Sequence, residues 1–292
     1  MVKILIADKM GDGAISKIRQ AGEVIISTPA TLDSEILQAE VLVVRSATKV
    51  TKELIRNANS LKLVIRAGVG LDNVDSNACK EKGIIVKNTP GASTNAVAEL
   101  AIAMILGISR KVGFLHSKLT QGEWAKKEGA GSEISGKTLA IIGMGRIGQS
   151  VAQKASALGM NIIYTDREQK PLSYKFYPNL VDLLQNADYI SIHASAEKGA
   201  PALLSKKEFD SCKKGAYIIN LARGSLIEES ALIDVLKSGQ ISGAALDVYP
   251  TEPYVGELEI LENVLLTPHV GASTNEAQLK IADEIVEHIK AI

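Results

Sequence analysis

Short runs of apolar residues recur along the chain and are separated by segments with helical spacing. One series lies in the first third, at 2–7, 23–27, 41–45, 63–67 and 84–88. A second lies further on, at 138–143, 161–166, 189–193, 217–221, 243–248 and 264–268. Strands that are apolar throughout and alternate with helices are typical of parallel sheets covered on both faces. The pattern therefore predicts an α/β fold with two open twisted parallel sheets, one for each series.

Two further segments have helical spacing. Residues 95–119 lie between the two series and precede a polar, glycine-containing stretch at 125–137, so we expect one long helix joining two domains. The final segment, 273–292, places Leu279, Ile281, Ile285 and Ile289 close to one helical face. Because this segment is too short to form a domain, we expect it to pack on one already built.

Composition narrows the class of protein. Lys+Arg and Asp+Glu are equal at 33 each, so no overall field would attract nucleic acid or an anionic membrane. Cys79 and Cys212 are far apart and outside any C-x-x-C pair, which indicates reduced thiols rather than a metal site or disulfides. The N-terminus lacks a signal-peptide pattern, and the most apolar stretch, 96–108, is too short to span a bilayer. These features predict a soluble, cytoplasmic protein.

A glycine motif follows the first strand of the second series. Gly143, Gly145 and Gly148 form G-x-G-x-x-G between a strand and a helix, where the glycines allow a tight turn and close approach of a pyrophosphate. The next strand ends at Asp166, 18 residues beyond Gly148, as in dinucleotide sites. A carboxylate there binds the ribose hydroxyls and repels a 2′-phosphate, so the motif predicts NAD. Arg167 weakens this preference slightly, since an arginine can meet a phosphate.

Polar residues follow three later strands of the same series, in INLARGSLI, ALDVYPTEP and LLTPHVGAST. Ligands of open α/β sheets bind beyond the carboxyl ends of the strands. Arg223 is permanently charged and suits a substrate carboxylate and carbonyl. Histidine has an ordinary pKa near neutrality, so His269 suits acid–base catalysis, and Glu252 suits a hydrogen bond to its other ring nitrogen.

Each of these residues also has a plain structural interpretation. Arg223 could belong to a surface ion pair, Glu252 could be a solvated loop acid, and His269 could be a packed or exposed histidine. Their order behind the glycine motif and Asp166 favours the functional interpretation. The hypothesis is hydride transfer between a small 2-hydroxy acid and NAD.

The motifs GMGRIG, NLARGSLI, ALDVYPTEP and LTPHVGAST, in this order, resemble the D-2-hydroxyacid dehydrogenase family along essentially the whole chain. The resemblance implies that Arg223, Glu252 and His269 are catalytic. It implies a discontinuous substrate-binding domain, 1–92 with 273–292, and an inserted NAD-binding Rossmann domain, 93–272. It also implies a homodimer through the NAD-binding domains and a cleft that closes on substrate. Further cofactor contacts are expected at Arg146, Ile147, His193, Ala194, Leu221, Ala222, Asp247, Gly271 and Ala272.

The first series carries the indications of substrate. VVRSATKVT (43–51) and LVIRAGVGLDNVD (63–75) resemble the phosphoglycerate-oxidising members of the family more than the lactate or glyoxylate members. Arg45, Ser46 and Lys49 cluster at a strand end and suit a phosphate dianion. The loop of Gly68, Val69 and Gly70 can present N–H groups to a carboxylate. The expected reaction is oxidation of D-3-phosphoglycerate to 3-phosphooxypyruvate, the first step of serine biosynthesis. A solvated Lys49 and an ion-paired Arg45 are the alternative.

The chain departs from the family pattern at three places. Val69 stands where a threonine is common, Ser195 replaces the proline of an H-x-P element, and Lys126 or Lys127 stands for the arginine of Trp-Glu-Arg, here Trp124-Ala125-Lys126. The chain ends soon after the final helical segment, so we expect no C-terminal regulatory domain. Two alternatives remain. One is a reductase of glyoxylate, hydroxypyruvate or another 2-oxo acid; the other is an NAD-sensing corepressor of the same fold, which the retained catalytic residues disfavour.

Overall fold

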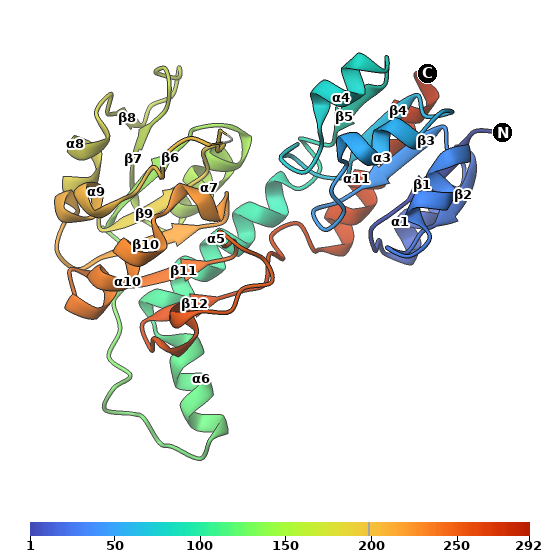
Figure 1. Cartoon of the computed structure of the whole chain (residues 1–292). Coiled ribbons are helices and arrows are strands. Elements are labelled where there is room, and N and C mark those ends of the chain that lie inside the picture. Colours follow the sequence, from blue (N-terminus) through green and yellow to red (C-terminus); the bar gives the residue numbers. More distant parts are fainter. Residues whose placement is uncertain (198) are drawn as a thin grey trace. The chain divides into compact units, whose positions relative to one another are not determined.

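A computed structural model describes residues 1–197 and 199–292, and these divide into two compact units (Figure 1). The N-terminal unit comprises Met1–Ala96 and Ala272–Ile292, and the central unit comprises Val97–Gly271. The sequence placed the changes of domain after 92 and after 272. The chain instead changes unit after 96 and after 271, so Ala272 lies in the N-terminal unit.

The N-terminal unit contains a five-stranded parallel sheet, and every strand of the first predicted series is present in it. The strand order is β2-β1-β3-β4-β5. The strands are β1 (Lys3–Ile6), β2 (Glu23–Ile26), β3 (Val41–Val44), β4 (Leu63–Arg66) and β5 (Ile85–Asn88). This is the flavodoxin-like order of doubly wound folds, in which ligands bind beyond the carboxyl ends of the strands.

Both faces of this sheet are buried because alternate side chains of the same strands enter two different cores. Ile4 and Ile6 pack on the side of α1 and α11, whereas Leu5 packs on the side of α3 and α4. This alternation explains why the strands are apolar throughout. The helices of the unit are α1 (Asp12–Ile18), α2 (Leu32–Glu35), α3 (Lys52–Asn57), α4 (Ser76–Glu81) and α11 (Asn275–Lys290), with the 3₁₀ turn η1 (Ile36–Gln38).

The C-terminal helix α11 belongs to the N-terminal unit, as Figure 1 shows by its place among the first strands. The Thr274 side chain caps it by accepting a hydrogen bond from the Ala277 N–H at 3.1 Å. Of the four predicted apolar positions, Ile281, Ile285 and Ile289 are buried in the core. Leu279 is 38% exposed, and its Cδ2 lies beside Gly13 of α1. The expectation that this segment packs on an existing domain is confirmed.

The central unit contains a seven-stranded sheet in the order β12-β11-β10-β9-β6-β7-β8, with all pairs parallel. The strands are β6 (Thr138–Ile142), β7 (Asn161–Thr165), β8 (Lys175–Phe176), β9 (Tyr189–Ile192), β10 (Ala216–Asn220), β11 (Ile241–Leu246) and β12 (Val264–Leu266). Its first six strands follow the Rossmann order, and the chain reverses direction across the sheet between β6 and β9. The sequence missed β8, because two residues at a sheet edge carry no hydrophobic period.

Helices cover both faces of the central sheet. One core lies against α5 and α7, and the other against α8, α9 and α10. The helices are α5 (Thr94–Ser109), α6 (Val112–Thr120), α7 (Arg146–Ala157), α8 (Leu180–Gln185), α9 (Lys206–Ser211) and α10 (Glu229–Ser238), with the 3₁₀ turns η2 (Gly224–Leu226) and η3 (Glu257–Ile260). The two predicted parallel sheets with helices on both faces are therefore confirmed.

The long helix expected over 95–119 is wrong in one respect, because it breaks into α5 and α6. Lys111, between them, has a left-handed backbone with φ of 53°. Gly107 before the break and Gly113 after it both lie against the Leu265 side chain. In a straight helix, positions six residues apart point in directions about 120° apart, so they could not both meet one side chain. The break lets the chain fold around Leu265.

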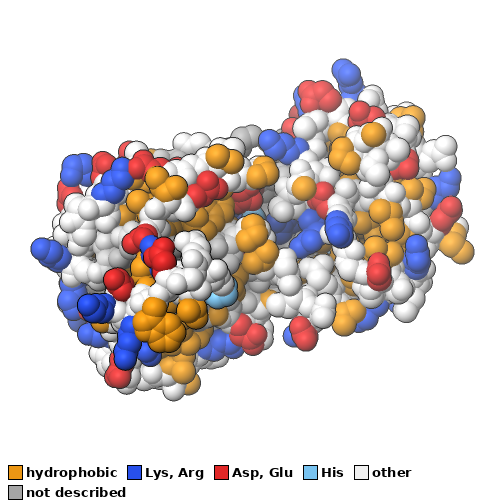
Figure 2. Space-filling view, turned by 90° about the horizontal axis from the view of Figure 1, so that it is seen from below, with side chains coloured by type: hydrophobic (Ala, Val, Ile, Leu, Met, Phe, Trp, Pro, Cys, Tyr) orange, Lys and Arg blue, Asp and Glu red, His pale blue; other side chains and the backbone are white. Residues whose placement is uncertain are grey.

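The surface agrees with the balanced charge of the sequence. On the face shown in Figure 2, acidic and basic side chains intermingle. Within the described residues, we find no helix with the length and apolar character needed to cross a membrane.

Candidate active site

The glycine motif forms the turn between β6 and α7. Gly143 has φ of 94°, and a Cβ there would lie 2.7 Å from the Ala194 backbone nitrogen. A Cβ on Gly148 would collide with the Gly143 carbonyl oxygen, so the helix packs directly on the turn. Gly145, the N-cap of α7, faces open space, with nothing within 4 Å of a Cβ built there. The turn thus leaves room at a helix N-terminus, where a pyrophosphate would bind.

Asp166 is connected to the same turn. One carboxylate oxygen, Oδ2, accepts a hydrogen bond from the Met144 N–H at 2.8 Å, and Oδ1 accepts one from the Arg167 N–H at 2.6 Å. Met144 lies between the first two glycines of the motif. The acid therefore holds the glycine turn while keeping lone pairs for the hydroxyls of a ribose. The residues present fit a dinucleotide with an unphosphorylated ribose.

His193 and Ala194 follow β9, on the other side of β6. The His193 N–H donates to the Ile142 carbonyl at 2.7 Å, and its ring Nε2 lies 2.8 Å from the Ser191 hydroxyl. Burial of the ring lowers the pKa of His193 to about 4, so the ring is neutral near pH 7. The predicted cofactor residues of β6, β7 and β9 thus gather where the strand order reverses.

The loop that carries Arg223 is fixed by a buried residue, Asn220. The Asn220 side-chain amide donates to the Arg223 carbonyl at 2.9 Å, and its oxygen accepts from the Ala222 N–H at 3.0 Å. The Arg223 guanidinium donates through Nη1 to the Ala222 carbonyl at 2.6 Å. The side chain is partly exposed at the carboxyl end of β10.

Gly224 explains how the arginine loop approaches the glutamate loop. A Cβ at Gly224 would collide with the backbone of Tyr249 and Pro250. The absence of a side chain lets the turn after Arg223 pack directly on the segment that leads to Glu252. The glycine of the A-R-G motif is therefore required by close packing rather than by a left-handed backbone.

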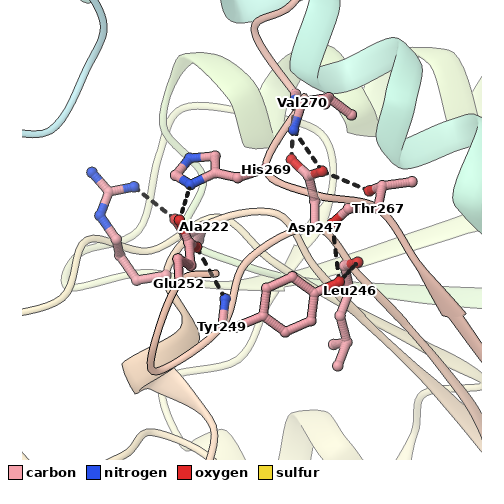
Figure 3. Close-up of polar contacts among 10 residues, drawn as sticks. Ala222, Leu246, Asp247, Tyr249, Glu252, Thr267, His269 and Val270 are labelled. Carbon is pink, nitrogen blue, oxygen red and sulfur yellow. Dashed lines mark hydrogen bonds and ion pairs between the residues drawn. The ribbon is translucent and has the colours of Figure 1, made fainter. Parts of the chain in front are cut away.

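Glu252 and His269 form the centre of the site (Figure 3). Glu252 Oε2 lies 2.8 Å from His269 Nδ1, and its other oxygen accepts from the Tyr249 N–H at 3.2 Å. Both side chains are about one-third exposed. Because Nδ1 faces the carboxylate, Nε2 is the ring nitrogen that can exchange a proton with a substrate. The pairing anticipated between Glu252 and His269 is present in the structure.

Asp247 holds the histidine loop from beneath, as Figure 3 shows. Its carboxylate, in a residue only 1% exposed, accepts from the Thr267 hydroxyl at 2.6 Å and from the N–H groups of Val270 and Gly271, each at 2.8 Å. His269 between them has φ of 52°. The Tyr249 hydroxyl donates to the Thr267 carbonyl, 2.9 Å away. Asp247 and Gly271 were predicted as cofactor contacts, and here both take part in holding the loop.

In the N-terminal unit, the loop with Arg45, Ser46 and Lys49 is held by Asp8. The Asp8 carboxylate accepts from the Arg45 N–H, and from the Thr48 hydroxyl at 2.7 Å. The Arg45 guanidinium donates to the Lys9 carbonyl at 3.0 Å. Ser46 and Lys49 are exposed. The three predicted residues thus share one ordered loop at the end of β3.

The glycine loop after β4 is built differently from the expectation. Gly68 has φ of 149°, and the Arg66 guanidinium occupies the position that a Cβ would take. The Gly68 N–H donates to the Arg66 carbonyl at 2.8 Å, which leaves the N–H groups of Val69 and Gly70 for an anion. Arg66 is therefore a basic residue at this loop that sequence reasoning missed.

Other residues that hold the site were also missed: Asp8, Asn73, Asn220, Tyr249 and Thr267. Asn73 illustrates why, since its side chain donates to the carbonyls of Arg45 and Thr48 from a loop that is distant in sequence. The available signal was position, because several of these residues directly follow or end a strand. The departures at Val69, Lys126 and Ser195 lie at exposed positions.

Comparison with known proteins agrees with this geometry. A D-3-phosphoglycerate dehydrogenase of Methanocaldococcus jannaschii is 42% identical over 301 residues, which cover all of this chain and 57% of that protein. A hydroxypyruvate reductase of Thermotoga maritima is 43% identical over 259 residues, covering 87% of this chain and 85% of that protein. The chain thus spans little more than half the length of the first relative.

A solved structure adds a relative with a different cofactor. The NADPH-dependent glyoxylate/hydroxypyruvate reductase of Sinorhizobium meliloti, in complex with citrate, superposes with a TM-score of 0.89 at 29% identity, covering 100% of this chain and 94% of that one. Residues 102–271 match the family described as D-isomer specific 2-hydroxyacid dehydrogenase, NAD binding domain. The chain belongs to the D-isomer specific 2-hydroxyacid dehydrogenase family.

Proposed function

We propose that this protein oxidises D-3-phosphoglycerate to 3-phosphooxypyruvate with NAD, the first step of serine biosynthesis. The observation that carries the reaction type is the 2.8 Å pair of His269 Nδ1 and Glu252 Oε2, in loops that follow strands of the sheet that also bears the glycine turn. The D-3-phosphoglycerate dehydrogenase relative supports the substrate. His269, Glu252 and Arg223 are the proposed catalytic residues.

The proposed mechanism follows from the hydrogen bonds of these residues. Nε2 of His269 takes the proton of the substrate hydroxyl, while Glu252 stabilises the positive charge that the ring gains. Arg223 binds the substrate carboxylate and the carbonyl oxygen that forms at C2. Bound NAD supplies the acceptor for the hydride that leaves C2. In the reverse direction, the protonated histidine returns its proton to the alkoxide.

The cofactor proposal assigns the pyrophosphate to the turn of Gly143, Gly145 and Gly148, and the ribose hydroxyls to Asp166. The open space at Gly145 and the hydrogen bond from Met144 to Asp166 support this assignment. Arg146, Ile147 and Gly148 open the helix whose N-terminus would face the phosphates. The remaining proposed contacts come from loops that follow the strands: His193, Ala194, Leu221, Ala222, Asp247, Gly271 and Ala272.

The phosphate end of the substrate is assigned to Arg45, Ser46 and Lys49, and the carboxylate to the N–H groups of Val69 and Gly70 in the loop that begins at Gly68. Support comes from the ordered loop that Asp8 holds and from the concentration of basic side chains, to which Arg66 adds. A phosphate dianion is stabilised by several fork and point-charge donors. An unphosphorylated acid would not need them.

Reduction of hydroxypyruvate is the second candidate, and the Thermotoga relative favours it because this chain covers 85% of that protein. A panel of substrates separates the two candidates. It compares oxidation of D-3-phosphoglycerate with NAD or NADP against reduction of hydroxypyruvate and glyoxylate with NADH or NADPH. We expect the highest kcat/KM on the phosphorylated acid with NAD. A preference for unphosphorylated acids would replace the first proposal with the second.

We also propose that the protein is cytoplasmic and forms a homodimer through the central unit. The dimer is supported by exposed apolar side chains on and after α6, where Val112 is 56%, Leu119 58% and Trp124 80% exposed. A second copy of the chain would cover such a surface. Light scattering coupled to gel filtration measures the mass directly, and a monomer would contradict the dimer.

A further inference from the structure

Arg167 is the residue that makes the cofactor preference of this site ambiguous. It directly follows Asp166, and its side chain is 78% exposed. An arginine beside the ribose can bind a 2′-phosphate through a bidentate fork. Since the solved relative from Sinorhizobium meliloti is NADPH-dependent, the family's fold accommodates a phosphorylated ribose. If the site prefers NAD, some other contact must keep this arginine from binding the 2′-phosphate of NADP.

Glu197 provides a partner for that arginine. The Glu197 Oε1 atom lies 2.6 Å from Arg167 Nη2. Arg167 follows β7 and Glu197 lies in the loop after β9, while β6 lies between these strands in the sheet. The ion pair thus crosses the end of β6, where the glycine turn begins. It joins the two loops that flank the proposed adenosine end of the cofactor site.

The side chains of the neighbouring residues Asp166 and Arg167 are held differently. Both oxygens of Asp166 accept backbone hydrogen bonds, so its carboxylate stays at the turn. The Arg167 side chain reaches Glu197 through a long, exposed and flexible stem. An exposed ion pair contributes little to stability, so it redirects the guanidinium without locking it. The preference between NAD and NADP then depends on how often the Arg167 guanidinium is paired with Glu197.

We propose that Glu197 is a specificity-determining residue for NAD, because it retains Arg167 in an ion pair and so keeps the guanidinium from a 2′-phosphate. Asp166 repels the phosphate directly, and Glu197 removes the cation that would otherwise compensate. This inference rests on the proposed binding of NAD at the glycine turn. It does not depend on which hydroxy acid the protein oxidises.

The chain offers a matched control in Glu168. This acid is also a neighbour of Arg167 and is 77% exposed, against 72% for Glu197, but it pairs with Lys170 at 2.8 Å. Replacing either glutamate by glutamine removes the same charge from the same region. Only Glu197→Gln releases Arg167.

The test is binding of NADH and NADPH, measured by the change in nicotinamide fluorescence without substrate. Relative to the unmodified protein, we expect Glu197→Gln to bind NADPH about fivefold more tightly, with NADH changed less than about twofold. Glu168→Gln should change either affinity less than about twofold. Adding Arg167→Gln to Glu197→Gln should abolish the gain, since the released guanidinium is its source.

Two results would overturn the inference. One is an equal gain in Glu168→Gln and Glu197→Gln, which would indicate a general effect of charge. The other is a gain that persists without Arg167. If the unmodified protein binds no NADH, the proposed cofactor site and this inference fall together. If NADH binds but phosphoglycerate is not oxidised, only the proposed substrate falls.

Discussion

Asp8 in the N-terminal unit and Asp247 in the central unit have the same structural role. Each is a buried acid just after a strand, and each accepts hydrogen bonds from two backbone N–H groups and one threonine hydroxyl in a loop that follows another strand. Asp8 orders the loop of Arg45, and Asp247 orders the loop of His269. In both units a side chain just after a strand holds a loop that carries proposed site residues.

The two loops differ in which side chains they leave available to a substrate. Around Asp247, the ordered loop places one histidine with a left-handed backbone against one glutamate. Around Asp8, the loop leaves Ser46 and Lys49 exposed. Proton transfer needs one nitrogen at one place, whereas a phosphate dianion can be met by several mobile cations. The comparison favours the proposal of a single proton-transfer group in the central unit and of an anion site with several donors in the N-terminal unit.

Replacing the histidine tests the proposed proton-transfer site, and it has the largest expected effect. We expect His269→Asn to lower kcat by about 10²- to 10⁴-fold, because the substrate hydroxyl loses its proton acceptor. NADH binding, measured by fluorescence titration, should stay within about twofold, since His269 is remote from the glycine turn in this assignment. A kcat equal to that of the unmodified protein would remove His269 from the mechanism.

Removing each buried acid tests the structural parallel. Asp247→Ala should lower the free energy of unfolding by about 3 kcal/mol, because three donors in a nearly solvent-free position lose their acceptor. Asp8→Ala should cost about 2 kcal/mol, since Asp8 is 9% exposed and water can replace part of its bonding. Urea unfolding measures both. Asp234→Ala, at an exposed position of α10, should change stability by less than about 0.5 kcal/mol; equal losses in all three variants would contradict the parallel.

The pH dependence of stability should carry a contribution from His193 in the central unit. Its pKa is lowered from 6.5 to about 4, so between these values the unfolded chain binds more protons than the folded one. The contribution of His193 to stability is complete above pH 6.5 and is lost as the pH falls toward 4. From pH 7 to pH 5 the loss due to His193 is about 2 kcal/mol.

Urea unfolding of the unmodified protein and of His193→Gln at pH 7 and pH 5 isolates this contribution. The variant should lose about 2 kcal/mol less over that interval, because carboxylates titrate equally in both proteins. Parallel losses would mean that His193 does not titrate as its burial requires.

Replacing Arg45 of the proposed anion site should have the smallest effect. Arg45→Ala should lower kcat/KM for D-3-phosphoglycerate by about tenfold, with hydroxypyruvate changed less than about twofold, because only the phosphorylated acid uses the cation. Lys87→Ala, a basic residue on β5 outside the loop, serves as the control for overall charge. Equal losses on both substrates in Arg45→Ala would argue against a phosphate site.

Much of the site could be anticipated from local patterns. The strands and the glycine turn are patterns within single segments of the sequence. The pairing of Glu252 with His269 followed from the chemistry of the two side chains and from their motifs after successive strands. The loops' supports could not be anticipated, because Asp8 and Thr48, or Asp247 and Gly271, meet only when separate strands align. The break at Lys111 was missed for the same reason, since the residues on either side of it pack against Leu265 of a strand distant in sequence.

The sequence by itself determined the two parallel sheets, the family resemblance and the residues that carry the proposed chemistry, because hydrophobic period and motif spacing are local properties. The tertiary structure decided which side chains hold those residues in place: Asp8 at the loop of Arg45, Asp247 at the histidine loop and Glu197 at Arg167. Such contacts join the carboxyl ends of strands that are far apart in the chain. They exist only once the strand order of the sheet brings those ends together.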